Sequence, residues 1–345
     1  MSAQTAQQNK KIGKAVQEAL DRGVGAIDLT QLPNLTDMSA ESITENVHAI
    51  NSLCKHDRLK FVMTHLVNHL HDFARSVGLT TEEWMQGIQF LTKTGQTCSD
   101  IRQEFILLSD VLGLSALVDS MNHPKPQGAS DATVLGPFHT EDTQEHEVPN
   151  GGSIASEGKG EYMYVKGRVT DTQGKPVADC TIETWETDDE GLYDTQYADR
   201  DGPDCRGKVV TDSEGNYAFR CVRPVPYPIP NDGPVGGLLT HLHRHVFRPA
   251  HLHFWFKPPN EYEDLITAVY LKGDPYLQSD AVFGVKSSLV VDVEEVTDQN
   301  KAKELGFKSA PFYMLERDWI LITKEQAEVE KRKSLKAYYD SIQQK

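Results

Sequence analysis

The chain of 345 residues is long enough to bury one large hydrophobic core or two smaller ones. Its 51 acidic and 35 basic residues give a formal net charge of −16 at pH 7, which would repel nucleic acid and anionic membranes, so we expect neither nucleic-acid binding nor membrane insertion. The N-terminal residues lack the apolar stretch of a secretion signal, and the five cysteines lack Cys-x-x-Cys spacing; both features predict a cytoplasmic protein with free thiols.

Helical patterns fill the first 120 residues. Apolar residues recur at helical spacing over residues 59–73, and Gly78 is placed to end this helix. Thr80 and Glu83 form a capping-box pattern that predicts the start of a second helix, and a third helix is predicted over residues 101–117. We interpret the apolar stripes as helix packing, with burial against a second subunit as the alternative.

From about residue 130 the pattern changes to short strands separated by turns. Tyr217, Phe219 and Cys221 alternate with other residues after a turn signal, and the β-branched run 287–293 predicts a further strand. Several such strands are typical of a β-sandwich. After residue 323 the helical pattern returns.

The order of these elements predicts an α+β fold, with a helical N-terminal domain followed by a β-sandwich. We place the helical domain at residues 1–125, the sandwich at 126–323 and a C-terminal helix at 324–345. A Pro-rich connection that begins at His123 marks the first boundary.

The segment Arg248-Pro-Ala-His-Leu-His253 contains the first candidates for a functional site. In an extended strand, residues i and i+2 project to the same face, so His251 and His253 are placed to hold one ion. Tyr193 follows an acidic turn, and Tyr227 lies in a Pro-rich loop that restricts its backbone. Ligation by tyrosine needs a strongly charged cation such as ferric iron to displace the phenol proton. Taken singly, the histidines are also explained as a hydrogen-bonded pair, and each tyrosine as a half-buried residue with a bonded hydroxyl.

Five ordered motifs resemble those of the intradiol ring-cleaving dioxygenases, most closely their hydroxyquinol 1,2-dioxygenase branch. They occupy residues 133–138, 185–193, 227–236, 248–253 and 273–284, and the resemblance extends over about residues 30–320.

The resemblance implies that a non-haem Fe(III) is held by Tyr193, Tyr227, His251 and His253. It also implies that Tyr227 leaves the iron and accepts a proton when an aromatic diol binds. Arg248 would stabilise the negative charge that develops during the reaction with O2. From the sequence alone, Arg248 is equally explained as a salt-bridged surface residue.

The resemblance further implies a mostly apolar substrate pocket that contains one carboxylate. Its residues are Leu107, Asp110, Val134, Leu135, Gly136, Pro137, Phe138, Ile229, Pro230 and Val282. Asp110 offers an acceptor for the third hydroxyl of hydroxyquinol (benzene-1,2,4-triol), a group that catechol lacks. We therefore expect cleavage of hydroxyquinol to 3-hydroxy-cis,cis-muconate (maleylacetate), with catechol 1,2-dioxygenase activity as the alternative. Asp110 is also explained as a residue that bonds the backbone near a helix end.

The resemblance also implies a homodimer formed through the helical domain, in some members with phospholipid between the subunits. Two other classes of protein remain as alternatives. One is a non-enzymatic β-sandwich binding module, and the other is a zinc or copper protein that uses His241, His243 and His245. We interpret this His-rich segment as a solvated loop without a metal, because it offers no paired Tyr or Cys.

Overall fold

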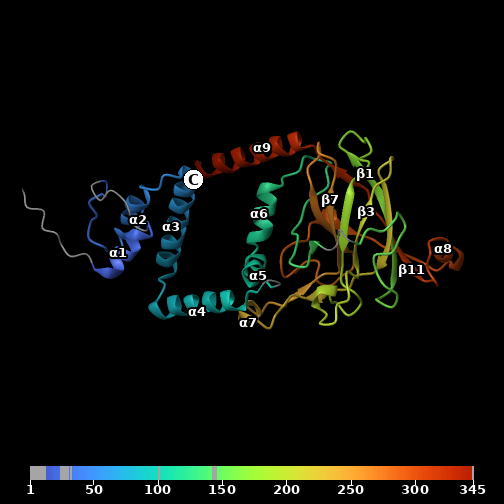
Figure 1. Ribbon diagram of the computed structural model, residues 1–345, viewed down its shortest axis with the longest axis horizontal. Coiled ribbons are helices and arrows are strands. Elements are labelled where there is room, and N and C mark those ends of the chain that lie inside the picture. Colours follow the sequence, from blue (N-terminus) through green and yellow to red (C-terminus); the bar gives the residue numbers. More distant parts are fainter. Residues whose placement is uncertain (1–12, 24–30, 32, 100–101, 142–145, 344–345) are drawn as a thin grey trace, which may run out of the picture. The chain divides into compact units, whose positions relative to one another are not determined.

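The computed structural model describes residues 13–23, 31, 33–99, 102–141 and 146–343 (Figure 1). The chain forms two compact units, Met1–Ile88 and Gln89–Lys345, and the division falls within a helix, α4 (Thr81–Thr97). This division does not test the predicted boundary between the helical and catalytic domains near residue 125, which stays a prediction.

The first unit contains the helices α1 (Lys14–Asp21), α2 (Ile43–Asn51) and α3 (Asp57–Val77). Helix α3 ends at Gly78, whose φ of 60° is left-handed, as the sequence predicts. The predicted capping box at the start of α4 is also confirmed. The Thr80 amide donates to the Glu83 carboxylate at 2.9 Å, and the Glu83 amide donates to the Thr80 hydroxyl at 3.2 Å.

The apolar stripe of α3 is not packed in the way that we expected. Val67 is the buried residue of this helix, whereas Leu66, Leu70 and Phe73 are 45%, 55% and 55% exposed. The interpretation of this stripe as helix packing is therefore wrong for these side chains.

The second unit contains α5 (Glu104–Val111), α6 (Leu114–Asn122), α7 (Pro234–His241), α8 (Gln299–Glu304) and α9 (Lys324–Gln343). The single helix predicted over residues 101–117 is wrong, because Gly113 has a left-handed φ of 74° that separates α5 from α6. Residue 101 lies outside the described residues. The predicted helix after residue 323 is confirmed as α9.

Two five-stranded sheets and a short ribbon make up the rest of this unit. In the first sheet, β1 pairs with β11 and β12 in parallel and with β4 in antiparallel orientation, and β10 pairs with β11. Its strands are β1 (Tyr162–Asp171), β4 (Asn216–Val222), β10 (Glu294–Val296), β11 (Phe312–Glu316) and β12 (Trp319–Leu321).

The second sheet has the order β3-β2-β7-β8-β9, and the ribbon pairs β5 with β6. The bounds are β2 (Thr181–Trp185), β3 (Arg206–Val210), β5 (Tyr227–Pro228), β6 (Phe247–Arg248), β7 (His251–Lys257), β8 (Leu265–Leu271) and β9 (Val290–Val291). Strand β7 lies inside the sheet, bonded to β2 on one side and β8 on the other.

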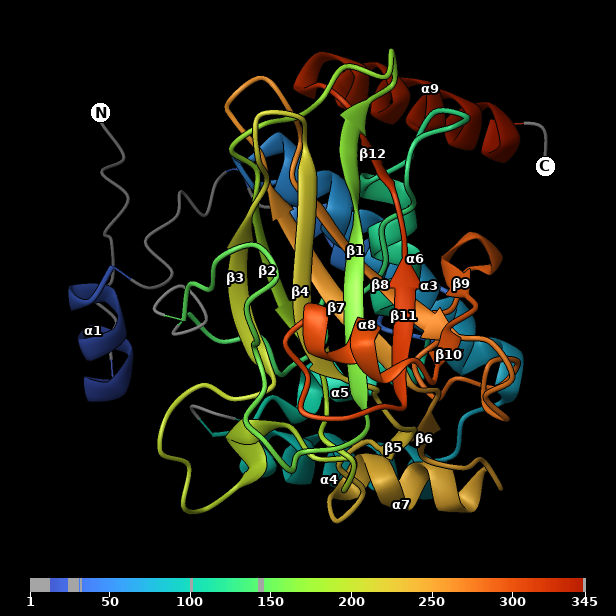
Figure 2. The same cartoon turned by 90° about the vertical axis from the view of Figure 1, so that its right-hand side faces the viewer.

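The main core lies between the two sheets, and Figure 2 looks onto the sheet that contains β1 and β11. Val165 and Phe219 from the first sheet and Phe254 and Val269 from the second are fully buried in one cluster. The alternation predicted at Tyr217, Phe219 and Cys221 is confirmed, because all three are buried in β4. A helical region followed by a β-sandwich confirms the α+β fold.

The strand predicted over residues 287–293 is largely wrong. A 3-10 turn, Ser287–Leu289, comes first, and β9 then pairs with β8 at only two positions, Tyr270↔Val290 and Leu271↔Val291. The β-branched composition favoured a longer strand, but the paired edge of β8 ends at these residues.

None of the helices in the described part of the chain has the length and apolar character needed to cross a bilayer. All five cysteines are free, and Cys180, Cys205 and Cys221 are buried.

Candidate active site

A tight turn after β2 positions Tyr193. The Asp188 carboxylate accepts the amides of Glu190 and Leu192, each at 3.2 Å, and Gly191 adopts a left-handed φ of 75°. An ideal Cβ at residue 191 would lie 3.4 Å from the Tyr227 Cβ, which is a van der Waals contact, so this turn lies directly against Tyr227. The acidic turn seen in the sequence thus brings the two tyrosines together.

Tyr227 opens the short strand β5 and pairs directly with Arg248 in β6. This ribbon brings together two candidate residues that lie 21 positions apart in the chain. Strand β7 follows at once, with His251 as its first residue and His253 two positions later. His253 lies opposite Trp185 of β2 and Ala268 of β8.

The four predicted ligands, Tyr193, Tyr227, His251 and His253, converge on one buried point. Their exposed fractions are 0%, 2%, 2% and 1%, respectively. The rings of the two tyrosines are 5.3 Å apart and perpendicular, and the Tyr227 and His251 rings are 5.5 Å apart. The two histidine Nε2 atoms are 3.0 Å apart.

Several polar atoms of this cluster fit a bound cation. The His251 Nδ1 lies 2.7 Å from the Pro249 carbonyl, so Nδ1 carries the proton and Nε2 presents a lone pair to the cluster. Two nitrogens about 2.1 Å from one ion, at right angles, would be about 3.0 Å apart, like the two Nε2 atoms. Within the described residues, the buried hydroxyl of Tyr193 has no hydrogen-bond partner, which a metal ion would explain.

Burial lowers the pKa of both histidines well below the usual value, so both are neutral, the form that ligates a metal. Burial, followed by the neighbouring Tyr227, raises the pKa of Tyr193 well above the usual value. Only a strongly charged cation would drive the deprotonation of Tyr193 at this place.

Arg248 is 2% exposed, so its alternative explanation as a surface residue is wrong. Its Nη1 lies 3.4 Å from the Tyr227 hydroxyl and 3.0 Å from His251 Nε2. Burial lowers the pKa of Arg248, but Asp280, Tyr227 and Tyr270 together more than offset this effect, and the pKa is raised well above its usual value. The guanidinium is therefore a permanent positive charge beside the predicted ligands.

A narrow cavity lies next to Tyr227 and Arg248. Nine of the ten predicted substrate-binding residues line it, namely Leu107, Asp110, Val134, Gly136, Pro137, Phe138, Ile229, Pro230 and Val282. Leu135 does not line it and faces a neighbouring groove instead.

Asp110 is the carboxylate of this cavity, and it is 6% exposed. Burial raises its pKa, an effect that the Ser115 hydroxyl and the charge of Arg248 offset only in part. In the described part of the chain, no backbone amide donates to this carboxylate, although the Asp110 carbonyl accepts the Gly113 amide at 2.9 Å. These contacts do not support the explanation of Asp110 as a residue that bonds the backbone, and the residue lines both the cavity and the neighbouring groove.

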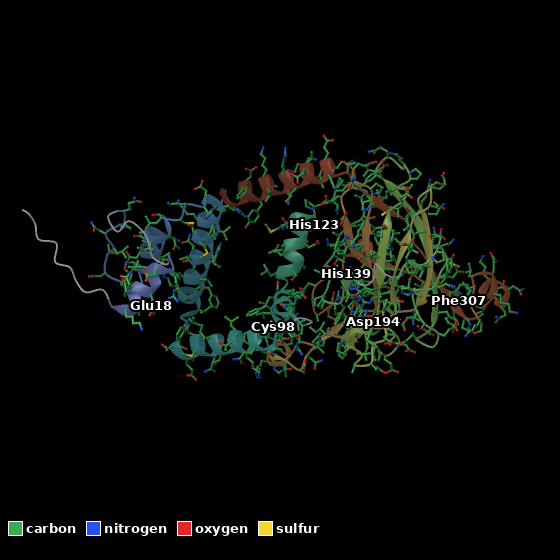
Figure 3. The ribbon with its side chains drawn as sticks, in the orientation of Figure 1. Glu18, Cys98, His123, His139, Asp194 and Phe307 are labelled. Atoms are coloured by element: carbon green, nitrogen blue, oxygen red, sulfur yellow. The ribbon has the colours of Figure 1, made fainter. Side chains whose placement is uncertain are left out.

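Two residues that hold the Tyr193 loop were not identified from the sequence. Arg206 is fully buried, and its Nε donates to the Asp194 carboxylate at 2.8 Å; Asp194 is labelled in Figure 3. The Nη1 of Arg206 also donates to the Phe138 carbonyl at 2.9 Å, and the Phe138 ring stacks on Tyr193 at 4.3 Å. One buried ion pair thus links the loop after Tyr193 to the cavity wall.

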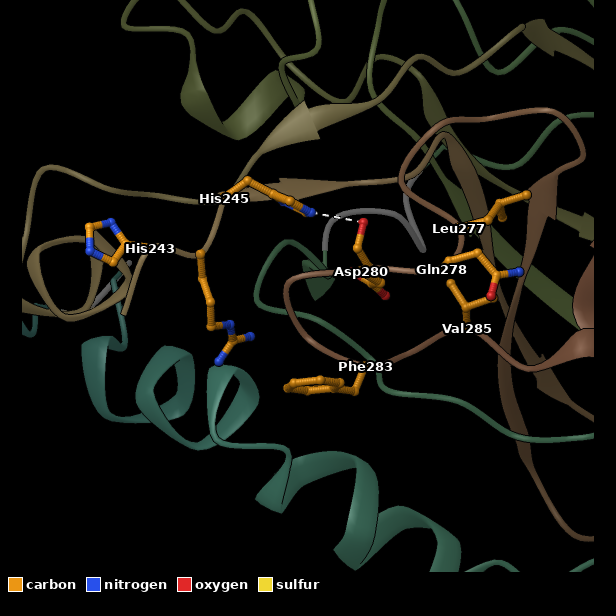
Figure 4. Close-up of a pocket in the computed structure, with 9 residues that line it drawn as sticks. His243, His245, Leu277, Gln278, Asp280, Phe283 and Val285 are labelled. Atoms are coloured by element: carbon orange, nitrogen blue, oxygen red, sulfur yellow. Dashed lines mark hydrogen bonds between the residues drawn. The ribbon is translucent and has the colours of Figure 1, made fainter. Parts of the chain in front are cut away.

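The His-rich segment lies at a different pocket, which Figure 4 shows. His245 Nε2 contacts the Ser279 hydroxyl at 2.8 Å, whereas the His243 ring lies apart from His245. Across the described residues, no group of three His, Cys, Asp or Glu side chains is placed to hold a metal ion.

Comparison with known proteins gives consistent matches over most of the chain. A family model described as "Dioxygenase" matches residues 134–310, and one described as "Catechol dioxygenase N terminus" matches residues 56–130. An intradiol ring-cleavage dioxygenase of Aspergillus niger is 50% identical over 91% of this chain and 94% of its own length. A hydroxyquinol 1,2-dioxygenase of a Rhizobium species is 47% identical over 81% of this chain and 95% of its own.

Among solved structures, a hydroxyquinol 1,2-dioxygenase from Pseudomonas putida DLL-E4 superposes with a TM-score of 0.77 and 40% identity. The match covers 83% of this chain and 99% of that chain. The match to the "Dioxygenase" family model includes the segments that carry the converging tyrosines and histidines. The chain belongs to the intradiol ring-cleaving dioxygenases.

Proposed function

We propose that the protein cleaves hydroxyquinol with O2 between the two carbons that carry adjacent hydroxyls, at a ferric ion held by Tyr193, Tyr227, His251 and His253. The observation that carries this proposal is the convergence of these four side chains beside a cavity lined by the predicted pocket residues. The product retains both oxygen atoms of O2 and is 3-hydroxy-cis,cis-muconate, the enol form of maleylacetate.

A ferric ion at this point would supply a Lewis acid that draws negative charge from a bound diol. Residues of the chain would supply the proton acceptor and the charge stabilisation. Tyr227, which lines the cavity, would accept a proton from the diol. The fixed charge of Arg248, 3.4 Å from the Tyr227 hydroxyl, stabilises the negative charge that develops on the substrate.

Hydroxyquinol is our first choice of substrate because the cavity combines mostly apolar walls with a single carboxylate. Leu107, Ile229 and Val282 provide apolar contacts for an aromatic ring, and Asp110 provides the partner for a third hydroxyl. Two of the relatives described above are named hydroxyquinol 1,2-dioxygenases. Catechol is the alternative substrate, since it fits the same walls without using Asp110.

We further propose a homodimer through the helical domain, residues 1–125, with residues 126–323 as the catalytic domain. The exposed Leu66, Leu70 and Phe73 of α3 support this proposal, because an apolar stripe of this kind is typical of a subunit or lipid contact. Phospholipid at this stripe belongs to the same proposal. The five free thiols are consistent with a cytoplasmic location.

The test is to load the purified protein with iron under oxidising conditions and incubate it with hydroxyquinol and 18O2. We expect a wine-red protein with a broad visible band from tyrosinate bound to Fe(III), and a ring-opened product that contains both labelled atoms. Tyr193→Phe and His251→Ala should lose the band or the bound iron, whereas His243→Ala should keep both. A protein that stays colourless, as a binding module or zinc protein would, contradicts the proposal, and equal iron loss in the His243 variant contradicts the ligand assignment.

A further inference from the structure

One edge of the Arg248 guanidinium is held by groups that the proposed chemistry does not use. Arg248 Nε lies 3.1 Å from Asp280 Oδ1, and Nη2 lies 3.4 Å from Asp280 Oδ2. Nη2 also donates to the Tyr270 hydroxyl at 3.3 Å. The Arg248 and Asp280 side chains are both 2% exposed, so the pair is shielded from water.

The opposite edge of the guanidinium faces the predicted ligands. Nη1 is the atom that approaches Tyr227 and His251, at 3.4 and 3.0 Å. An arginine side chain has many rotamers, and its use as a fixed charge requires that these be restricted. Holding Nε and Nη2 leaves Nη1 with one direction, which is toward the predicted ligands.

Gly284 provides independent evidence that this arrangement is built into the sequence. A Cβ at this position would lie 2.7 Å from the Tyr270 hydroxyl, 3.0 Å from Arg248 Nη2 and 3.2 Å from Asp280 Oδ2. These are the three groups that meet around the guanidinium edge. Residue 284 must therefore lack a side chain for Asp280, Tyr270 and Arg248 to come together.

The carboxylate of Asp280 also fixes the chain that follows it. Oδ2 accepts the Gly284 amide at 2.9 Å, and Oδ1 accepts the Val282 amide at 3.3 Å. The Gly284 carbonyl in turn accepts the Thr133 hydroxyl at 2.6 Å. Val282 lines the substrate cavity, so the same carboxylate connects the arginine to the cavity wall. Figure 4 shows Asp280 on the loop after β8, which also carries Phe283.

We propose that Asp280, together with Tyr270 and Gly284, is a positioning residue that orients the Arg248 guanidinium for turnover. The inference rests on the proposed function of Arg248, and it adds that the arginine acts only when its Nε and Nη2 edge is held.

The experiment uses the full-length, iron-loaded protein and the variants Asp280→Asn, Tyr270→Phe and Gly284→Ala. We expect kcat with hydroxyquinol to fall by about 10- to 100-fold in Asp280→Asn, with little change in KM, iron content or visible band. Tyr270→Phe should lose less, because it removes one contact. If Asp280→Asn does not fold, Tyr270→Phe and Gly284→Ala carry the same comparison.

Asp171→Asn is a matched control. The Asp171 carboxylate is 7% exposed, accepts the amides of Gln173 and Lys175 at 2.8 and 2.9 Å, and lies 3.4 Å from the Tyr262 hydroxyl. It resembles Asp280 in burial and in bonding but does not touch Arg248. We expect this variant to lose stability and keep its kcat.

Each variant is also made in an Arg248→Ala background. If Asp280 acts through Arg248, the Asp280→Asn change should have no further effect on kcat there. Additive losses, a shifted visible band in Asp280→Asn, or an equal fall of kcat in Asp171→Asn would overturn the inference. A wild-type kcat in Arg248→Ala itself would instead overturn the role proposed for Arg248, whatever Asp280 does.

Discussion

At the scale of single residues, Asp110 is the side chain on which the choice between two substrates depends. Its carboxyl group lies in a cavity whose other walls are mainly apolar, and burial raises its pKa. We expect Asp110→Ala to lower kcat/KM for hydroxyquinol by about 1–3 kcal/mol, because the third hydroxyl loses its partner. Catechol lacks this hydroxyl and should lose little. The values of kcat/KM for the wild-type protein and for Asp110→Ala, each measured with hydroxyquinol and with catechol, give this difference.

Asp119→Ala is the control for this change. Asp119 is a nearby carboxylate on α6 that lines the neighbouring groove without lining the cavity, and it bonds His123 at 2.9 Å. Its removal should affect both substrates alike. If Asp110→Ala lowers kcat/KM equally for hydroxyquinol and catechol, the role of Asp110 is structural. If the wild-type protein has the higher kcat/KM with catechol, catechol and not hydroxyquinol is the preferred substrate.

The candidate ligands were accessible to sequence analysis because their signals are local. His251 and His253 lie two positions apart on one strand, and each tyrosine follows a recognisable turn or Pro-rich loop. The supporting residues around the site were missed because their contacts join distant parts of the sequence. Asp280 and Arg248 are 32 residues apart, and Arg206 and Phe138 are 68 residues apart. Such pairs have no periodicity, so only the folded sheets reveal them.

At the scale of elements, the sequence predicted where helices and strands occur better than it predicted where a helix ends or how long a strand is. A glycine in the Leu112-Gly113-Leu114 sequence was the available signal for the break between α5 and α6, since its left-handed φ ends the first helix. For β9 there was no such signal. Its length depends on the partner edge of β8, which the local composition of residues 287–293 does not encode.

Helix α7 depends on a side chain from another helix. Glu104 of α5 is fully buried, and its Oε1 accepts the amide of Val235, in the first turn of α7, at 3.1 Å. Glu104→Ala leaves this buried amide without a partner, so we expect a loss of about 1–3 kcal/mol in the free energy of unfolding. Urea-induced unfolding measures this loss.

Glu325→Ala is the comparison for that experiment. Glu325 is an exposed acidic residue in the first turn of α9, and its removal should change the free energy of unfolding by less than about 0.5 kcal/mol. Arg102 pairs with Glu104, but it would keep a partner in Glu104→Ala because it also pairs with Asp232 at 2.9 Å. Similar unfolding midpoints for the two variants would show that Glu104 does not stabilise α7.

At the scale of the whole molecule, a buried acid connects the two sheets. Glu186 follows β2 in one sheet, and its Oε1 accepts the amide of Val222, the last residue of β4 in the other, at 3.0 Å. In the described part of the chain its Oε2 has no partner, and burial raises the pKa of Glu186 well above the usual 4.5. The folded protein therefore keeps a proton that the unfolded chain releases.

This difference makes stability depend on pH. Since the folded state binds more protons, the contribution of Glu186 is complete below pH 4.5 and is lost as the pH rises toward the raised pKa. Glu186→Gln cannot ionise, so its stability relative to wild type should increase by up to about 1.4 kcal/mol per pH unit over that interval. Urea unfolding of both proteins at about pH 5 and pH 8 measures the effect. A constant difference would mean that Glu186 is ionised in the fold.

The four proposed ligands differ in how firmly their backbones are anchored. The histidines lie on β7, which is hydrogen-bonded on both sides, whereas Tyr227 lies on a ribbon of only two residue pairs. Local opening of such a ribbon breaks few bonds, but opening at β7 would disrupt the whole sheet. On loss of a bound metal, Tyr227 should therefore move before the two histidines, which would keep the geometry needed to bind another ion.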